Sequence, residues 1–343
     1  MTAPIASESR SFEVSWDTHR STTRGQGLLL TIAGLALIPA VTATVLRVVP
    51  PSDDPTALIA AFIPYGLLAY LLAFVCLVVA WARARRRAVL LSITSLVLIL
   101  ISAHVAWLAP LFVADARPAT TAEFTLLSFN MRNGSADLTT LSAQAEQADI
   151  VILIETTPPA LNALKRDRNW DQRFPYAIGD PRDDMSNTAI YSRLPLGDGT
   201  LLGRTSFQQW DTTVEVPQVG SVRLLAVHPC NPYCGGGRWA TEHLALRDAV
   251  AADLERPTIV AGDFNAVDDH GPMQRLRGLG LKSATDIVGA GWQPTYPANR
   301  RFPPLMPIDH VLVNDQLTAT SITTLQNKDS DHLGLLAVLA GAA

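Results

Sequence analysis

The stretch TIVAGDFNA, residues 258–266, indicates the fold of this chain more clearly than any other. Apolar and β-branched residues lead to a glycine, and Asp263 and Asn265 follow at once. An apolar run of this length, bounded by turn residues, is typical of a strand buried on both faces. We therefore predict a strand at Thr258–Gly262. Taken alone, Asp263 and Asn265 are ordinary turn residues, so a functional interpretation requires that the pattern recur.

Polar residues follow other apolar runs of the sequence in the same way. Each has an ordinary structural explanation, since an acid can cap the next helix and a single histidine is usually a packed residue. If the runs are strands that lie side by side, however, carboxylate, amide and imidazole groups converge on one rim. The residues so placed are Asn130, Glu155, His228, Asp263, Asn265, Asp309, Asp331 and His332.

Strand-like runs alternate with helical patterns over the last two thirds of the chain, which predicts a layered α/β domain. The predicted strands are Phe124–Asn130, Asp149–Ile154, Thr188–Ser192, Val222–His228, Thr258–Gly262, Asp309–Val313 and Leu333–Leu339. The predicted helices are Asp137–Gln147, Pro158–Lys165, Trp239–Leu254 and Pro272–Leu279.

The side chains at the strand ends suit a divalent cation and the hydrolysis of a phosphoester. Mg²⁺ prefers carboxylate and amide oxygens and commonly also contacts substrate phosphate. An Asp beside an Asn can align a water molecule, and an Asp paired with a His can orient an imidazole. Phosphoester hydrolysis needs a held nucleophile, a neutralised phosphate and a stabilised leaving group.

The order of motifs in this domain resembles the endonuclease/exonuclease/phosphatase superfamily. The motifs are LSFN at 127–130, ILIE at 152–155, NTAIYSR at 187–193, AVHP at 226–229, GDFNA at 262–266, PIDHVLV at 307–313 and SDH at 330–332. The resemblance covers Phe124 to Leu339 and implies a DNase I-like, four-layer α/β sandwich. It also implies Mg²⁺, with Mn²⁺ as the alternative, held mainly by Glu155, with Asn130 in support and Asp331 contributing directly or through water.

The resemblance further implies the catalytic roles. Asp263 would orient or deprotonate the attacking water, and Asn265 would hold that water or a phosphate oxygen. His332, oriented by Asp309, would contact the phosphate and stabilise developing charge. His228 matches a histidine that touches the scissile phosphate in the DNase I-like and sphingomyelinase-like branches.

Three positions depart from the family pattern. Arg132 stands where some family nucleases have an acidic residue, which argues against a second metal. Ile154 stands where Gln is common, and no tyrosine immediately precedes Asn187 as it does in abasic-site nucleases. These departures argue against a role in DNA repair.

The first third of the chain is strongly apolar and predicts three transmembrane helices. Uncharged runs cover Gly25–Leu46, Pro55–Ala82 and Ala88–Ala114, each long enough to cross a bilayer. Charge is 17% of the whole chain, well below the roughly 25% of soluble proteins. We predict a cytoplasmic tail at 1–24, a three-helix membrane region at 25–114, a linker at 115–123 and a catalytic domain at 124–343.

Positive charge in the short loops predicts the orientation of the spans. The loop Arg83–Arg87 contains four arginines and should stay in the cytoplasm, as should Arg20 and Arg24. The loop with Arg47, Asp53 and Asp54 suits the outside. Three crossings then place the domain outside the cytoplasmic membrane, in contact with the bilayer.

The charge of the domain bears on its partners. Residues 115–343 carry 19 basic and 26 acidic side chains, a formal charge of −7, so a large basic surface for nucleic acid is absent. A phosphate-ester substrate remains compatible because a bound cation can supply the positive field. Nucleic acid is therefore a substrate that we do not favour, and the sequence indicates no protein partner.

Two further features bear on the site. Cys230 and Cys234, directly after His228, suit a disulfide outside the cytoplasm, with a zinc site or free thiols as alternatives. Arg238 and the pair Arg300 and Arg301 could contact a second phosphate or a lipid headgroup, or simply belong to packed surface loops.

The sequence predicts a membrane-tethered, metal-dependent phosphoesterase that hydrolyses a phosphodiester. The substrate could be a phospholipid headgroup, an extracellular nucleic acid or a small phosphate ester. One alternative is a catalytically silent binding or sensor module that retains the fold. Another is an accessory protein of a transporter, although His104 is the one imidazole in the spans and they contain no charged pathway.

Overall fold

The structure is a computed structural model, and it describes residues 16–84, 88–166, 169–183 and 187–343. The chain forms two compact units. One contains the residues up to Val45 together with Pro64–Val105, and the other contains Leu46–Ile63 together with Ala106–Ala343. Arg85, Arg86 and Arg87, which were used above to orient the spans, lie outside the described residues, as do residues 1–15 of the predicted tail.

Three helical segments are long and apolar enough to cross a membrane, over Arg24–Val48, Ile63–Ala82 and Ala88–Leu111. Most of their residues belong to the first unit. The segments correspond to α1 (Trp16–Val48), η1 (Ile63–Tyr65) with α3 (Gly66–Ala82), and α4 (Ala88–Leu108) with η2 (Ala109–Leu111). Apolar side chains on their outer faces are exposed, as lipid-facing residues are. His104 is buried, with its Nε2 3.1 Å from Thr44 Oγ1, so its polar group is satisfied inside the bundle.

The second apolar run is divided, where the sequence predicts one continuous span from Pro55. Helix α2 (Asp54–Ala60) begins at the N-cap Asp53, which accepts a hydrogen bond from Thr56 N, and it ends at Ala61. Pro64 has no N–H for a continuing helix and follows this end directly, so the chain restarts at η1. Only Ile63–Ala82 has the character of a span, and α2 belongs to the second unit.

Two mixed six-stranded sheets form the second unit. The first has the order β11 (Leu317–Leu325), β12 (Gly334–Gly341), β1 (Phe124–Asn130), β2 (Ile150–Thr156), β4 (Asn187–Ser192) and β3 (Tyr176–Ile178). The second has the order β5 (Thr200–Leu201), β6 (Trp210–Val216), β7 (Gly220–Val227), β8 (Thr258–Asp263), β10 (Asp309–Val313) and β9 (Lys282–Ser283).

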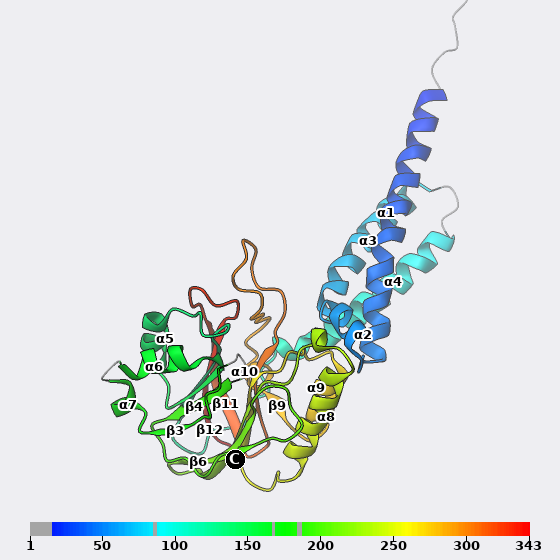
Figure 1. The fold of residues 1–343 in the computed structure, drawn as a ribbon. Helices are drawn as coiled ribbons and strands as arrows, with labels where there is room; N and C mark the ends of the chain where they lie inside the picture. Colours follow the sequence, from blue (N-terminus) through cyan, green and yellow to red (C-terminus); the bar gives the residue numbers. More distant parts are fainter. Residues whose placement is uncertain (1–15, 85–87, 167–168, 184–186) are drawn as a thin grey trace, which may run out of the picture. The chain divides into compact units, whose positions relative to one another are not determined.

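Helices cover the outer face of each sheet, as Figure 1 shows. On one side lie α5 (Leu138–Ala145), α6 (Pro158–Arg166) and α7 (Trp170–Arg173); on the other lie α8 (Arg238–Ala251) and α9 (Gly271–Arg277). The short α10 (Ala284–Val288) follows β9. The result is the four-layer α/β sandwich predicted from the sequence.

Three hydrophobic cores hold the layers together, and they explain why the strand runs are continuously apolar. In β2, Ile152 and Ile154 face the core between the sheets, whereas Val151 and Leu153 face the helices. In β8, Ala261 faces the core between the sheets and Val260 faces the helical layer. Strands buried on both faces need apolar residues at every position.

Every predicted strand and helix of the domain is present within a few residues of its expected bounds. Seven elements were not predicted from the sequence: the strands β3, β5, β6, β9 and β11 and the helices α7 and α10. In β6 and β11, threonine and serine interrupt the apolar pattern, because one face of these strands is only partly buried.

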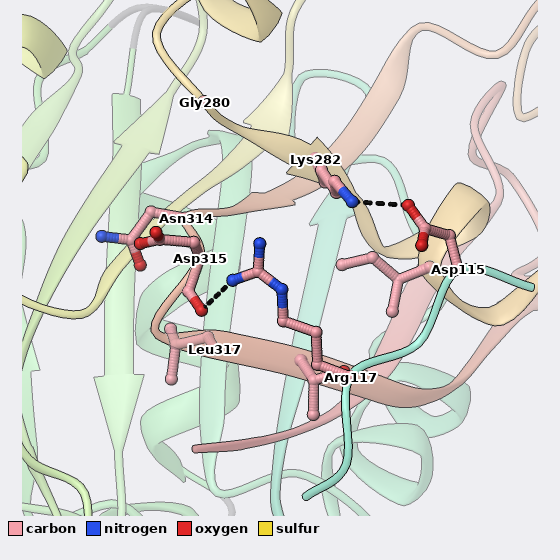
Figure 2. Close-up of a pocket in the computed structure, with 9 residues that line it drawn as sticks. Asp115, Arg117, Gly280, Lys282, Asn314, Asp315 and Leu317 are labelled. Atoms are coloured by element: carbon pink, nitrogen blue, oxygen red, sulfur yellow. Dashed lines mark hydrogen bonds and ion pairs between the residues drawn. The ribbon is translucent and has the colours of Figure 1, made fainter. Parts of the chain in front are cut away.

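The segment predicted as a linker is fastened to the domain. Figure 2 shows Asp115 paired with Lys282, and Arg117 donating to the backbone carbonyl of Asp315. Ala119 forms a β-bridge with Ala342. Asp115, Arg117, Lys282 and Asp315 line a hollow of about 10 Å³, which has room for one water molecule. The hollow is therefore a small gap in the packing of the linker against the domain.

Candidate active site

The topology brings the polar strand ends together. β1 and β2 are parallel neighbours, so Asn130 and Glu155 lie at the same sheet edge. In the other sheet Asp309 at the start of antiparallel β10 pairs directly with Asp263 at the end of β8. The two edges meet where the sheets pack face to face.

Asn130 joins the two edges and is fully buried. Its Nδ2 donates to Glu155 Oε1 at 3.1 Å and to Asp263 Oδ2 at 3.0 Å. Its Oδ1 accepts a hydrogen bond of 2.8 Å from Arg132 N, which orients the amide. One side chain therefore fixes the positions of two carboxylates that are far apart in the sequence.

Glu155 has a left-handed backbone conformation, with φ of 53°. The irregularity lies at a bulge, because the pairing of β2 with β4 shifts register between Ile154 and Thr156. Its Oε2 accepts a hydrogen bond of 3.0 Å from Asn133 N. Strained residues of this kind cost free energy and are found mainly at functional sites, where a bulge can redirect a side chain.

Gly262 allows β8 to approach β7. Its φ is 151°, and a Cβ built there would lie 2.0 Å from the carbonyl oxygen of Val227. The glycine of GDFNA is therefore required by packing between strands. It brings Asp263 against the end of β7, where His228 follows.

Asp263 is buried and surrounded by charge. Burial, together with the negative charge of Asp309, raises the pKa of its carboxyl to about 6. Its Oδ1 accepts a hydrogen bond of 2.8 Å from Asn265 N. Asn265 has a φ of 48°, and its Nδ2 donates to the carbonyl oxygen of Pro229 at 3.0 Å.

His332 is held as a cation. Its Nδ1 donates to Asp309 Oδ2 at 2.9 Å, and its Nε2 lies 3.7 Å from Asp263 Oδ2. Burial opposes the positive charge, but the carboxylates of Asp309 and Asp263 outweigh it and raise the pKa of His332 to about 10. Ser330 fixes the turn, because its Oγ accepts from His332 N and donates to the carbonyl oxygen of Asn130.

His228 is held as a neutral imidazole. Burial lowers its pKa to about 4, although Asp263 acts in the opposite direction. Its Nε2 lies 3.8 Å from Glu155 Oε1 and 3.9 Å from Asp263 Oδ2. Its ring stacks on Phe207 with the centroids 4.4 Å apart. The site thus contains one neutral and one charged imidazole around the same carboxylate.

A cavity of about 470 Å³ opens over these groups. Its polar lining includes Glu155, Asp263, Asn265, Asp331 and His332. The structure therefore brings the predicted site residues to one place, since the other three, Asn130, His228 and Asp309, contact this lining directly or lie within 4 Å of it.

Residues 127–332 match the Endonuclease/Exonuclease/phosphatase family. The chain belongs to this family. Its members are hydrolases that act on phosphoesters. A comparison with curated proteins found no match.

Solved structures with the fold of this family are similar to the domain. Humanized D. rerio TDP2 with 14 mutations has a TM-score of 0.53 at 13% identity, over 63% of this chain and 98% of its own. D. rerio TDP2 complexed with single strand DNA product gives 0.50 at 16% identity, over 64% and 99%. A functionally unknown conserved protein from Enterococcus faecalis V583 gives 0.51 at 14% identity, over 63% and 99%. At these identities the likeness shows the fold alone.

Divalent metals are general in the endonuclease/exonuclease/phosphatase family, and this site offers two overlapping groups of ligand atoms. Glu155, His228 and Asp263 form one group, and Asp263, Asp309 and His332 the other. The second suits a cation poorly, because Asp309 already pairs with the charged His332. The first offers carboxylate oxygens from Glu155 and Asp263, which fit a hard divalent cation. His228 adds a neutral imidazole, whose buried Nδ1 has no hydrogen-bond partner among the described residues.

Asp331 lines the cavity, but among the described residues it belongs to neither ligand group. Its Oδ2 lies 3.8 Å from Arg132 Nε. Arg132, the departure from the family pattern noted above, therefore stands against the carboxylate that the resemblance relates to the metal.

The three arginines predicted to contact substrate do not line the cavity. Arg238 donates to the carbonyl oxygens of Cys234 and Gly235, so it braces its own loop. Arg300 and Arg301 are exposed.

Cys230 and Cys234 form a disulfide, with their Cα atoms 6.2 Å apart. It closes the loop that contains η3 (Pro232–Cys234), from which Asn231 and Tyr233 line the cavity. Glu242 on α8 fixes the start of the loop by accepting a hydrogen bond of 2.8 Å from Cys230 N.

Other contributors to the site were missed in the sequence. Phe207 lies in an irregular loop without any repeating pattern, and Tyr296, whose ring centroid is 5.0 Å from that of His332, lies in a proline-rich loop. Ser330 is part of the SDH motif, and its position next to Asp331 and His332 was the signal that could have identified it as a site residue. The residues of α2 that line the cavity were concealed in an apolar run assigned to a span.

Proposed function

We propose that this chain is a membrane-tethered hydrolase of phosphodiesters that depends on a divalent cation, with Mg²⁺ preferred over Mn²⁺. One observation carries the proposal: Asp263, Glu155 and a protonated His332 line one cavity, and the neutral His228 lies within 4 Å of both carboxylates. Such a set can hold a water molecule, a cation and a phosphate together. Its two imidazoles have pKa values displaced in opposite directions, as is common at catalytic sites.

The cation would be held by Glu155, with Asn130 in support through its contact with that carboxylate. When bound, it would neutralise phosphate charge and favour ionisation of water. Asp263 is positioned to accept a proton from the attacking water, because a carboxyl with a pKa of about 6 is ionised at neutral pH and still basic enough. Asn265, beside Asp263, would position that water or a phosphate oxygen.

His332 would supply positive charge to the phosphate as the bond to the leaving group breaks. With a pKa of about 10 it stays protonated at neutral pH. Asp309 keeps it charged and fixes its ring through Nδ1. His228 is neutral, so it can contact a phosphate oxygen through a hydrogen bond without adding a second charge.

The substrate class remains part of the proposal. D. rerio TDP2 has been solved with a single strand DNA product, which keeps nucleic acid among the candidates. The formal charge of −7 on residues 115–343 disfavours a long polyanion. Among the described residues of the cavity lining, His332 is the one cationic side chain, and a phosphodiester with one negative charge fits it better.

The test uses the full chain in detergent or nanodiscs with bis(4-nitrophenyl) phosphate, phospholipid and DNA. We expect turnover with Mg²⁺, loss of turnover with chelator, and a decrease of roughly 10²- to 10⁴-fold for Asp263→Asn. Asp248→Asn is the matched control, since Asp248 is exposed on α8 and pairs only with Arg247 among the described residues. Turnover that persists in chelator and in Asp263→Asn would exclude the proposal.

A further inference from the structure

The segment between the first two candidate spans is built into the catalytic unit. Ala57 on α2 is fully buried in the same core as Val227 on β7 and Trp239 on α8. Its carbonyl oxygen lies 2.9 Å from His270 Nε2. His270 Nδ1 accepts a hydrogen bond from Val267 N, so Nε2 carries the hydrogen and donates to Ala57. This hydrogen bond from His270 therefore joins the start of α9 to α2.

Polar contacts hold the rest of the segment. The carbonyl oxygen of Pro51 accepts from Gly271 N at 2.9 Å, and Asp54 Oδ2 accepts from Gly237 N at 3.1 Å. A Cβ at Gly271 would lie 2.5 Å from Ser52 Oγ and 3.0 Å from the carbonyl oxygen of Pro51, so the segment packs closely here. These contacts run along the segment and hold α2 against the domain.

The face of α2 that the anchors present to the cavity is apolar. Ala57, Leu58, Ala61 and Phe62 line the same cavity as Glu155, Asp263 and His332. Met306 and Ile308 add to the apolar lining of this cavity. No Lys or Arg is found among the described residues of this lining, so nothing there would pair with a second phosphate. The cavity is chemically divided, with a phosphate end and a hydrocarbon wall.

Chain connectivity relates this wall to the bilayer. Phe62 is followed directly by the candidate span Ile63–Ala82, and the segment begins where the span Arg24–Val48 ends. A segment between two spans must lie at the membrane surface if both cross the bilayer. The residues of the wall from Ala57 to Phe62 therefore come from a segment that lies at the membrane surface if both candidate spans cross the bilayer.

From this division of the cavity we infer that α2 and the turn after it select the substrate, and that the substrate is a membrane phospholipid whose hydrocarbon chain lies against Leu58 and Phe62. The inference rests on the proposed function. In the reaction, water oxygen bonds to phosphorus, the bond from phosphorus to one alcohol oxygen breaks, and that oxygen takes up a proton. One water is consumed, and a phosphomonoester and an alcohol are formed.

The test measures chain-length preference with the full chain and Mg²⁺. Phospholipid with long acyl chains in vesicles is compared with the same headgroup on short, water-soluble chains, and bis(4-nitrophenyl) phosphate reports the chemistry alone. We expect wild type to prefer the long-chain substrate by about tenfold or more in kcat/KM, and Leu58→Asn and Phe62→Asn to lose most of that preference. The side chain of Phe62 is 45% exposed, so its substitution should leave the fold intact, which thermal unfolding checks.

Ile59→Asn is the matched control. Ile59 lies on the same helix and is 57% exposed, but it does not line the cavity, so its substitution should leave the preference unchanged. Equal turnover of long and short chains by wild type, with bis(4-nitrophenyl) phosphate still hydrolysed, would overturn the inference and leave the proposed function standing. A preference for single-stranded DNA over phospholipid would also overturn the inference. So would turnover of a free amphiphile, below its micelle concentration, that equals the turnover of long-chain phospholipid in vesicles. No hydrolysis of any substrate would remove the proposed function and the inference with it.

Discussion

At the residue scale, the site depends on groups whose charge is set by their neighbours. The side chain of Asp309 accepts a hydrogen bond from His332 through Oδ2, which orients that imidazole and, together with Asp263, keeps it charged. Asn130 plays a similar part for Glu155 and Asp263. These residues act through others, and their substitution should change how activity depends on pH as well as its size.

The pKa values of Asp263 and His332 predict a pH–rate profile with two limbs. Activity should fall below about pH 6, as Asp263 takes up a proton, and above about pH 10, as His332 loses one. Asp309→Asn removes the carboxylate that raises the pKa of His332, so the alkaline limb should move to lower pH and activity should fall by about 10²-fold or more. Steady-state rates from pH 5 to 11 measure both effects. An unchanged alkaline limb in the variant would show that the charge on His332 does not support activity.

Gly262 gives a prediction about stability. In Gly262→Ala the new Cβ would meet the carbonyl of Val227, and backbone cannot move away as a flexible side chain could. We expect a loss of about 3 kcal/mol or more in the free energy of unfolding, or no folded protein. Gly203→Ala is the control, since a Cβ there has no heavy atom within 4 Å. Thermal unfolding of the full chain in detergent compares the two, and equal melting temperatures would contradict the packing argument.

At the scale of elements, a strand was predictable from the sequence where burial on both faces made its residues apolar. β2 and β8 were predictable because they are buried on both faces and are therefore apolar throughout. β11 was missed because serine and threonine occupy its partly exposed face. For α2 the composition was misleading, since a helix with Ala57 in a protein core and Phe62 against a cavity has the composition of a membrane span. Pro64 was the local signal that the run is divided.

The anchor of α2 through His270 predicts a pH-dependent stability. Burial lowers the pKa of His270 to about 4, against about 6.5 in the unfolded chain. Between these values the unfolded chain binds a proton that the folded one does not, so stability is complete above pH 6.5 and decreases as the pH falls toward 4. The contribution lost is at most about 3 kcal/mol. His270→Gln cannot titrate, so its melting temperature should fall less steeply from pH 7 to 4.5; parallel slopes would contradict the prediction.

At the scale of the whole molecule, the sequence motifs were sufficient to place the chain in its family, because each lies at the end of a buried strand. The convergence of Asn130, Glu155, Asp263 and His332 followed from strand order, which the family resemblance supplied. The position of Phe207 under His228 had no local signal, because it depends on how a loop crosses the second sheet. The hydrocarbon wall was equally inaccessible, since its residues come from between two spans.

The sidedness of the domain is a prediction from charge. A reporter that is active only outside the cytoplasm, fused after Ala114, should be active in cells, and a cytoplasmic reporter at the same position should be silent. Replacing the arginines of the loop between the second and third spans with neutral residues should weaken this difference. Activity of the cytoplasmic reporter alone would place the domain inside.

Because the catalytic unit is discontinuous, it has a built-in order of biosynthesis. Leu46–Ile63 leaves the ribosome early, with Ala57 uncovered, and the second and third candidate spans are made before its packing partners Val227 and Trp239 exist. The segment Leu46–Ile63 can pack into its core only after translation of the second sheet is finished. A fragment beginning after the third helix could never complete this core, and its exposed apolar patch would favour aggregation.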